Sequence, residues 1–134
     1  MSDCIFCGIV SGDVEAEVVL ESADAIAFLD RYPAARGHVV VIPRIHAATL
    51  PELPDEAVGG FFRAVKTVMR KVSDALGPVG MHVGWNHGRG AGQHVFHLHV
   101  HVLPRQQPGR GVQLLGEGGE PGSLAEVAAA IRQA

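Results

Sequence analysis

The chain has 134 residues, of which 47% are hydrophobic and 19% charged, and its formal net charge is −3. These values suit one globular domain, residues 1–134, with its own hydrophobic core, and the negative charge gives no reason to expect nucleic acid as a partner. No apolar run approaches the roughly 20 residues that span a bilayer, and the N-terminus lacks the features of a signal peptide. We therefore expect a cytoplasmic protein without a membrane partner.

The first third of the chain predicts a short helix followed by three strands. Ser2 to Gly12 has helical apolar spacing and ends at a glycine. Glu17–Glu21 and Ala25–Leu29 are expected to pair as a hairpin, because a short turn separates them. His38–Ile42 is a β-branched run that predicts a third strand, ended by Pro43.

The rest of the chain predicts one long helix, two strands and a terminal helix. Apolar residues from Pro54 to Leu76 follow a helical period, and the Gly59–Gly60 pair inside it either weakens the first turns or permits close packing. Val79–Trp85 predicts the fourth strand. The glycines of Gln107–Gly122 predict a mobile segment, and a capping box at Ser123 predicts a short helix over 123–134. The order of elements indicates an α+β domain with a mainly antiparallel sheet.

Three histidines occupy alternate positions in the run Val95–Leu103. Successive side chains of a strand point to opposite faces, so His97, His99 and His101 are expected in a row on one face. Imidazole can bind a metal, attack an electrophile or change charge near neutral pH. A solvated strand face or an adventitious metal site is the plainer alternative. The opposite face should be buried, and it carries Phe96, Leu98, Val100 and Val102.

A glycine-rich loop, Asn86–Gln93, comes directly before the histidine run. Glycines let backbone N–H groups approach a ligand and form a concave nest for an anion. A phosphate held by this loop would lie next to the histidines. An ordinary hairpin loop is the alternative, and only the position of the loop favours the phosphate.

These blocks together resemble the histidine triad (HIT) nucleotide-binding family. The resemblance runs from Cys4 to about Arg105 and is nearest to the Hint-like and bacterial hydrolase branches. It implies a HIT-like fold, in which a five-stranded antiparallel sheet carries one long helix and short terminal helices. It also implies a homodimer whose sheets join edge to edge. The matching blocks are His97–Leu103, Phe28–Asp30, Gly37–His46, Asn86 and Gly92–Gln93.

The resemblance implies a nucleotide hydrolase that acts at the α-phosphate of a nucleoside phosphoramidate or a dinucleoside polyphosphate. His99 would attack the phosphorus and form a nucleotidyl-histidine intermediate, which water would then release. His101 would stabilise the phosphate oxygens, while His97 and His38 would support the triad. A nucleotide-binding or sensor module without turnover, or a nucleotidyltransferase, would keep the same residues. The leaving group stays open.

The resemblance also assigns substrate contacts. Asp30 would bind the ribose hydroxyls, although a carboxylate that caps a turn is the simpler reading of a loop aspartate. His94 stands where many Hint-like proteins have a serine, so its part in leaving-group assistance is open. An apolar pocket for a purine base would be formed by Ile5, Phe6, Ile9 and Phe28, and phosphate contacts by Asn86, Gly92, Gln93 and His94.

Cys4 and Cys7 form a Cys-x-x-Cys pair, a spacing that often supplies two zinc ligands. Two reduced thiols are the alternative. The resemblance to zinc-bearing members of the family, and to galactose-1-phosphate uridylyltransferases, adds His46 and His97 as the other two ligands. Such a four-ligand Zn²⁺ site would be structural, and no metal would be needed for the chemistry. A metal chaperone would not need the nucleotide contacts.

Overall fold

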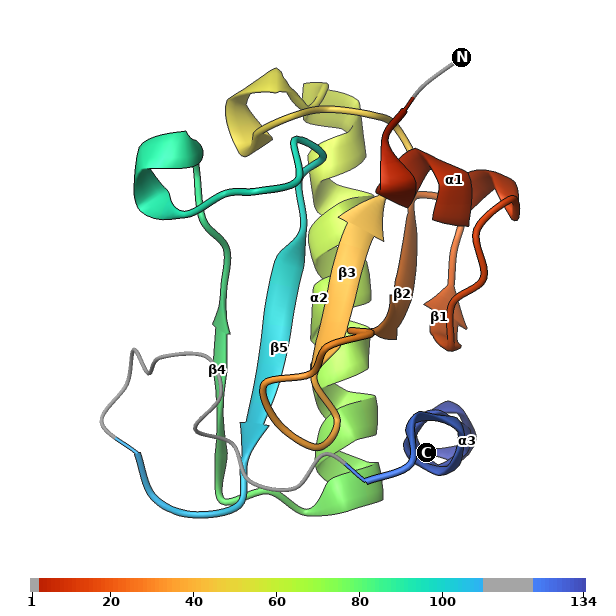
Figure 1. The fold of residues 1–134 in the computed structure, drawn as a ribbon, viewed down its shortest axis with the longest axis vertical. Helices are drawn as coiled ribbons and strands as arrows, with labels where there is room; N and C mark the ends of the chain where they lie inside the picture. Colours follow the sequence, from red (N-terminus) through yellow and green to blue (C-terminus); the bar gives the residue numbers. More distant parts are fainter. Residues whose placement is uncertain (1–2, 110–121) are drawn as a thin grey trace.

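The computed structural model describes residues 3–109 and 122–134. Five strands form one antiparallel sheet in the order β1-β2-β3-β5-β4 (Figure 1). This confirms the expected α+β class and the five-stranded sheet. In chain order the elements are α1 (Ile5–Ser11), β1 (Val18–Glu21), β2 (Ala25–Leu29), β3 (Val39–Pro43), η1 (Leu50–Glu52), α2 (Asp55–Leu76), β4 (Gly80–Gly84), η2 (Arg89–Ala91), β5 (Val100–Arg105) and α3 (Leu124–Gln133).

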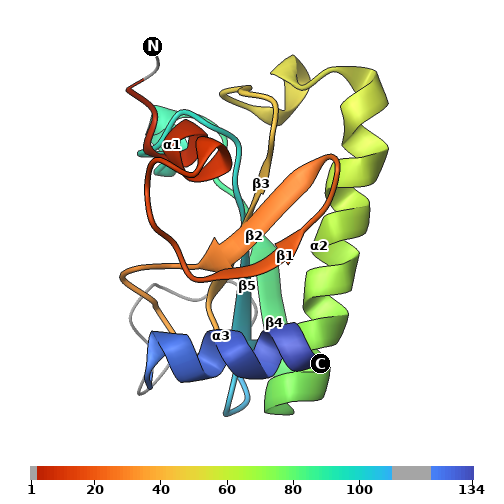
Figure 2. The same ribbon diagram turned by 90° about the vertical axis from the view of Figure 1, so that its right-hand side faces the viewer.

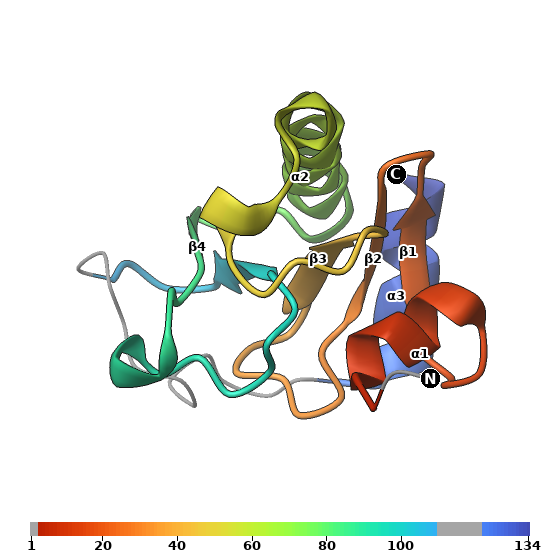
Figure 3. The same ribbon diagram turned by 90° about the horizontal axis from the view of Figure 1, so that it is seen from above.

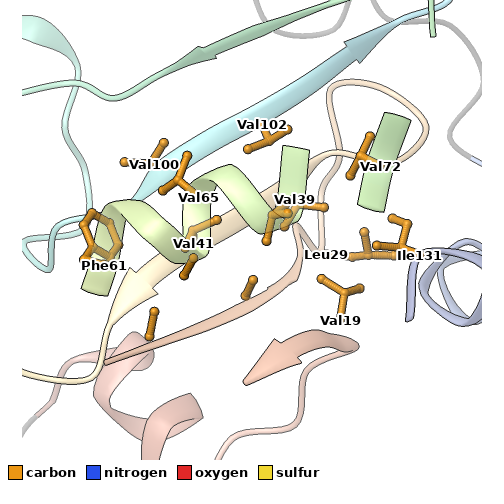
Figure 4. Close-up of a cluster of buried hydrophobic side chains, with 14 of the residues drawn as sticks. Val19, Leu29, Val39, Val41, Phe61, Val65, Val72, Val100, Val102 and Ile131 are labelled. Carbon is orange, nitrogen blue, oxygen red and sulfur yellow. The ribbon is translucent and has the colours of Figure 1, made fainter. Parts of the chain in front are cut away.

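The sheet is covered on both faces, with α2 on one side and α1 on the other (Figure 2). β2 and β3 are therefore buried along their whole lengths, and their alternating side chains enter two separate cores. The larger core, which includes Leu29, Val39 and Val41, packs against α2 and α3 (Figure 4). The smaller core lies beneath α1 and contains Ile9, Ile26, Phe28, Val40 and Ile42.

The predicted helices form close to the expected boundaries. α2 ends at Gly77, whose φ of 56° suits a glycine, and α1 ends in the same way at Gly12, with φ of 85°. The Ser123 side chain accepts a hydrogen bond from the Glu126 N–H, which confirms the predicted cap of α3. α3 packs against α2 and β1 at one side of the molecule (Figure 3).

The prediction for the histidine strand is wrong at its start. β5 begins only at Val100, where pairing with β3 begins, and the Leu98 N–H bonds to the Ala47 carbonyl instead. Without a ladder the strict alternation fails, so Phe96 is 39% exposed although it was expected to be buried. Most of the segment predicted to be mobile, residues 110–121, lies outside the described residues. Across residues 3–109 and 122–134, no helix has the length and apolar character to cross a membrane.

Of the two alternatives for the Gly59–Gly60 pair, the structure shows close packing, and it involves Gly60 alone. A Cβ on Gly60 would collide with the side chain of Asp24 in the β1–β2 turn, and even the Asp24 Cβ lies 2.9 Å from that position. A Cβ on Gly59 would lie 3.7 Å from the Arg63 Nη2, an ordinary contact. The helix therefore passes close to the hairpin at Gly60.

We expect Gly60→Ala and Gly59→Ala to change stability in opposite directions. Gly60→Ala should lower the free energy of unfolding by about 1–3 kcal/mol, because the Asp24 backbone has to move. Gly59→Ala should raise it by about 0.5–1 kcal/mol, since alanine favours the helix. Urea unfolding of both variants measures the difference, and equal effects would contradict the close packing at Gly60.

Candidate active site

The face of the sheet beneath α1 opens into a cavity of about 780 Å³, a size usual for small-molecule sites. Part of its floor follows one row of paired residues, in which His101 pairs with Val40 and Val40 with Phe28. Two strand spacings make this row about 10 Å long. The cavity lining includes seven of the predicted site residues, namely Ile5, Phe6, Ile9, Phe28, Asp30, His99 and His101.

His99 has its tautomer set by the main chain. Its Nδ1 lies 2.8 Å from the His97 carbonyl oxygen, and because a carbonyl only accepts, Nδ1 must carry the proton. Burial lowers the pKa of His99 below 6.5, against the opposing effects of this hydrogen bond and of the Asp30 charge. The ring is therefore neutral at pH 7, with an unprotonated Nε2.

His101 has the opposite tautomer, which is set by a chain of two hydrogen bonds. The Ala34 N–H donates to His38 Nδ1 at 3.1 Å, so the proton of the neutral His38 ring is on Nε2. His38 Nε2 lies 2.8 Å from His101 Nδ1 and donates to it. His101 must then hold its own proton on Nε2. The Ala34 N–H therefore fixes the tautomer of the buried His38, and His38 in turn fixes the tautomer of His101 at the cavity wall.

The two cavity histidines therefore offer complementary groups. The rings of His99 and His101 meet edge-on with centroids 5.1 Å apart, one with a bare Nε2 and the other with an Nε2–H. Burial and the neighbouring His38, His99 and His82 lower the pKa of His101 to about 3. An unprotonated ring nitrogen and a neutral N–H donor thus lie side by side without charge repulsion.

Asp30, His38 and His101 also bring possible ligand atoms within 4.8 Å of one another. A metal on His38 Nε2 would have to displace the proton donated to His101, while His38 Nδ1 already accepts from the Ala34 N–H. The ring would then become an imidazolate or lose its backbone hydrogen bond. These three residues suit a proton-bearing network better than a metal ion.

Asp30 caps a turn, the simpler of the two roles weighed from the sequence, and it also lines the cavity. Its Oδ1 accepts the Tyr32 N–H at 2.9 Å and so caps the turn after β2. Its Oδ2 lies 3.6 Å from His38 Nε2, and the side chain lines the cavity. One carboxylate oxygen thus stabilises the turn, while the side chain remains part of the cavity lining.

In the loop before β5, two N–H groups of the expected phosphate nest are used within the protein. The N–H groups of Gly92 and Gln93 donate to the carbonyls of Arg89 and Gly88 within the loop's own turn. The buried Gln93 amide accepts from the Gly88 N–H and donates to the carbonyls of Ala48 and Val95. Gln93 therefore anchors the loop through its side chain. Four predicted contacts are absent from the cavity lining, namely Asn86, Gly92, Gln93 and His94.

Several lining residues were not predicted from the sequence. Arg31 and Tyr32 directly follow Asp30, so adjacency to a candidate could have found them. The others come from the α1–β1 connection, β2, β3, the segment before β5 and α3, and only the tertiary fold brings these segments together at the cavity. The residues missed are Glu15, Ala16, Glu17, Leu29, Arg31, Tyr32, Val40, Val95 and Leu124.

A second cluster, Cys4, Cys7, His46 and His97, lies beside the cavity. The His97 Nδ1 is 3.5 Å from the sulfur of Cys4 and 3.5 Å from that of Cys7, and His46 Nδ1 is 3.2 Å from the Cys7 sulfur. The four ligand atoms lie within 4.8 Å of one another. Residues 93 positions apart thus meet as the sequence predicted.

This cluster fits a tetrahedral zinc ion. Zn–S and Zn–N bonds of about 2.3 and 2.0 Å at tetrahedral angles give S···N separations of about 3.5 Å, close to those observed. His97 Nε2 lies 2.9 Å from the Pro43 carbonyl and donates to it, which leaves the Nδ1 lone pair for a metal. Burial lowers the pKa of His97, so the ring is neutral.

Comparison with known proteins identifies the family. A model of the HIT domain matches residues 11–108. The chain belongs to the HIT family. This HIT protein is 44% identical over 102 residues to the adenosine 5′-monophosphoramidase hnt1 of Schizosaccharomyces pombe, covering 76% of this chain and 74% of that one.

A bacterial relative and a solved structure are also similar. The protein hit of Bacillus subtilis is 39% identical over 109 residues, which are 81% of this chain and 75% of that protein. The crystal structure of a zinc-bound histidine triad family protein from Mycobacterium smegmatis matches with a TM-score of 0.82 and 34% identity, covering 98% and 91% of the two chains. The predicted family and fold are thus confirmed, and with them the expectation of an enzyme of this family.

We expect His101 to stay neutral well below pH 6.5. Its pKa is about 3 in the folded HIT domain and near 6.5 when unfolded, so the unfolded chain binds the extra proton. Its contribution to stability is complete above pH 6.5 and is lost towards pH 3, by up to about 1.4 kcal/mol per pH unit. NMR titration of the imidazole would show a midpoint far below 6.5, and a midpoint near 6.5 would contradict the burial argument.

Cys7→Ser should release zinc and lower stability. The change removes one of four ligands but keeps the Cys4 side chain, which caps α1. Loss of zinc present at a hundredfold excess over its Kd would cost about 2.7 kcal/mol. Mass-spectrometric metal analysis and thermal unfolding measure both effects, with Ser11→Ala at the other end of α1 as control. Stoichiometric zinc in Cys7→Ser would exclude this ligand set.

Proposed function

We propose that this HIT protein hydrolyses a nucleotide at its α-phosphorus through a nucleotidyl-histidine intermediate on His99. The observation that carries the proposal is the tautomer pair at the cavity wall, with a bare Nε2 on His99 and an Nε2–H on His101. A nucleophile without a proton and a neighbouring donor are what a phosphoryl displacement requires.

In the first step the His99 Nε2 lone pair forms a bond to the α-phosphorus as the bond to the leaving group breaks. The His101 N–H donates to a phosphate oxygen and stabilises the charge that develops there. The positive charge that His99 gains is stabilised by the His97 carbonyl, to which Nδ1–H already donates. The leaving group departs with the electron pair of its bond to phosphorus and takes up a proton. Water then attacks the phosphorus and releases a proton in turn, the electron pair of the P–N bond returns to His99 Nε2, and the nucleoside monophosphate leaves.

The cavity residues suit the rest of a nucleotide. Ile5, Phe6, Ile9 and Phe28 offer an apolar slot for a purine base, and the Asp30 carboxylate lines the same cavity, 3.6 Å from His38 Nε2. The S. pombe relative is named for an adenosine phosphoramidate activity, which supports a nucleoside phosphoramidate as substrate. A dinucleoside polyphosphate, a transferase reaction or nucleotide sensing would use the same geometry.

Zn²⁺ in the proposed function is structural and takes no part in the reaction. Cys4, Cys7, His46 and His97 would hold it, and the metal would link the segments that carry these four ligands. The solved zinc-bound relative from M. smegmatis supports this assignment. The chemical steps need only the histidines and water.

The predicted homodimer would use β4, the sheet edge that α3 does not cover. At the other edge, α3 packs against β1 and the Arg132 Nη1 donates to the Val18 carbonyl. β4 has half-exposed residues along most of its length, and Val79 before it is 63% exposed. Among the described residues β4 pairs only with β5, and a sheet edge of this kind can pair with its own copy.

Hydrolysis of adenosine 5′-phosphoramidate tests the proposal. His99→Ala should lower kcat by about 10³-fold or more while AMP affinity changes by less than about tenfold, because the nucleophile acts mainly in the transition state. His87→Ala, an exposed histidine outside the cavity lining, is the matched control and should keep normal turnover. A diadenosine polyphosphate assayed in parallel compares the two substrate classes.

Near-normal turnover in His99→Ala would exclude the mechanism. If the unmodified protein binds AMP but turns over neither compound, the nucleotide-binding module or a transferase lacking its acceptor is favoured instead.

A further inference from the structure

Helix α1 belongs to both sites at once. Cys4 precedes it and Cys7 lies in its first turn, and both sulfurs face His97 in the zinc cluster. The same helix supplies Ile5, Phe6 and Ile9 to the cavity lining. The geometry of both the zinc cluster and the cavity therefore depends on the position of α1.

Phe6 lies between the two sites. Its ring meets the His97 ring edge-on at a centroid distance of 6.0 Å and the His99 ring at 5.1 Å. It also packs on Phe28, the floor of the cavity, at 5.5 Å. A shift of α1 would therefore move Phe6 relative to Phe28 and relative to His99.

The other contacts of α1 fix it only in part. A seven-residue helix is too short to be stable alone in water, so its position depends on what it packs against. Ile9 is its only buried residue among those that the structure describes, while Ile5 is 45% exposed. The smaller core holds α1 through Ile9 and the partly buried Phe6 and Val10, and the cysteines connect the start of the helix to His46 and His97.

We propose that metal binding at Cys4, Cys7, His46 and His97 raises nucleotide affinity by fixing α1 as the wall of the base slot. By thermodynamic linkage, bound nucleotide must raise metal affinity by the same factor. The inference rests on the proposed function, which places the base against α1. The metal then acts on binding of the nucleotide and leaves the tautomers of His99 and His101 unchanged, since other hydrogen bonds set these.

A thermodynamic cycle with Zn²⁺ and AMP tests the coupling. AMP Kd is measured by calorimetry on the zinc-loaded protein and on the chelator-treated protein, whose fold is checked by circular dichroism. Zinc affinity is measured by chelator competition with and without saturating AMP. We expect AMP to bind about tenfold more weakly without zinc, and zinc to bind more tightly with AMP by the same factor.

If the metal-free protein unfolds, its AMP Kd cannot be measured. The coupling is then measured by chelator competition on the zinc-loaded, folded protein, with and without AMP. Unchanged zinc affinity in the presence of saturating AMP would overturn the proposal. If AMP fails to bind even the zinc-loaded protein, the proposed function fails with it, whereas AMP binding that is independent of zinc removes only the coupling.

Two controls locate the coupling in α1. Ribose 5-phosphate lacks the base, so its affinity should not depend on zinc, and an equal dependence would place the coupling in the histidines and overturn the role of α1. Phe6→Leu keeps an apolar side chain but removes the ring contacts to His97 and His99. It should retain zinc and show a smaller coupling factor, and an unchanged factor would count against Phe6.

Discussion

The chemistry of this HIT domain depends on backbone groups that permit only one hydrogen-bonding role. A peptide N–H donates and a carbonyl accepts, so Ala34 and His97 determine which nitrogen of each cavity histidine carries a proton. Burial keeps the rings neutral, and neutrality makes the tautomer matter. The main chain therefore determines which ring nitrogens of His99 and His101 carry a proton, without the help of a ligand.

The two faces of the sheet are covered to different extents, and both covers contribute to the position of the cavity histidines. α2 covers one face and makes β3 and β5 rigid partners, so the row from His101 to Phe28 has fixed register. α1 covers the other face only in part, and the uncovered area is the cavity. One face carries the larger core, the other carries the smaller core and the cavity, and β2 and β3 contribute to both faces.

The sequence predicted the elements because periodicity and caps are local signals. α2, α3 and the β1–β2 hairpin appear near their expected boundaries, and the family resemblance brought together Cys4 and His97 across the chain. The segment before β5 was mispredicted because side chains alternate strictly only where a strand is hydrogen-bonded to a neighbouring strand. The Leu98 N–H instead donates to the Ala47 carbonyl. Glu17 and Leu124 were missed since nothing local marks a residue that only tertiary packing brings to a cavity.

His97 illustrates how one position can carry two constraints of different kinds. Its ring serves the metal cluster, but its contact with His99 is made by a main-chain carbonyl, which every amino acid possesses. Replacing the His97 side chain would therefore remove a ligand of the proposed zinc site and still leave the carbonyl that sets the tautomer of His99. Under the proposed function, loss of the metal site and loss of the reactive tautomer are thus separable at this position, although both depend on a single residue.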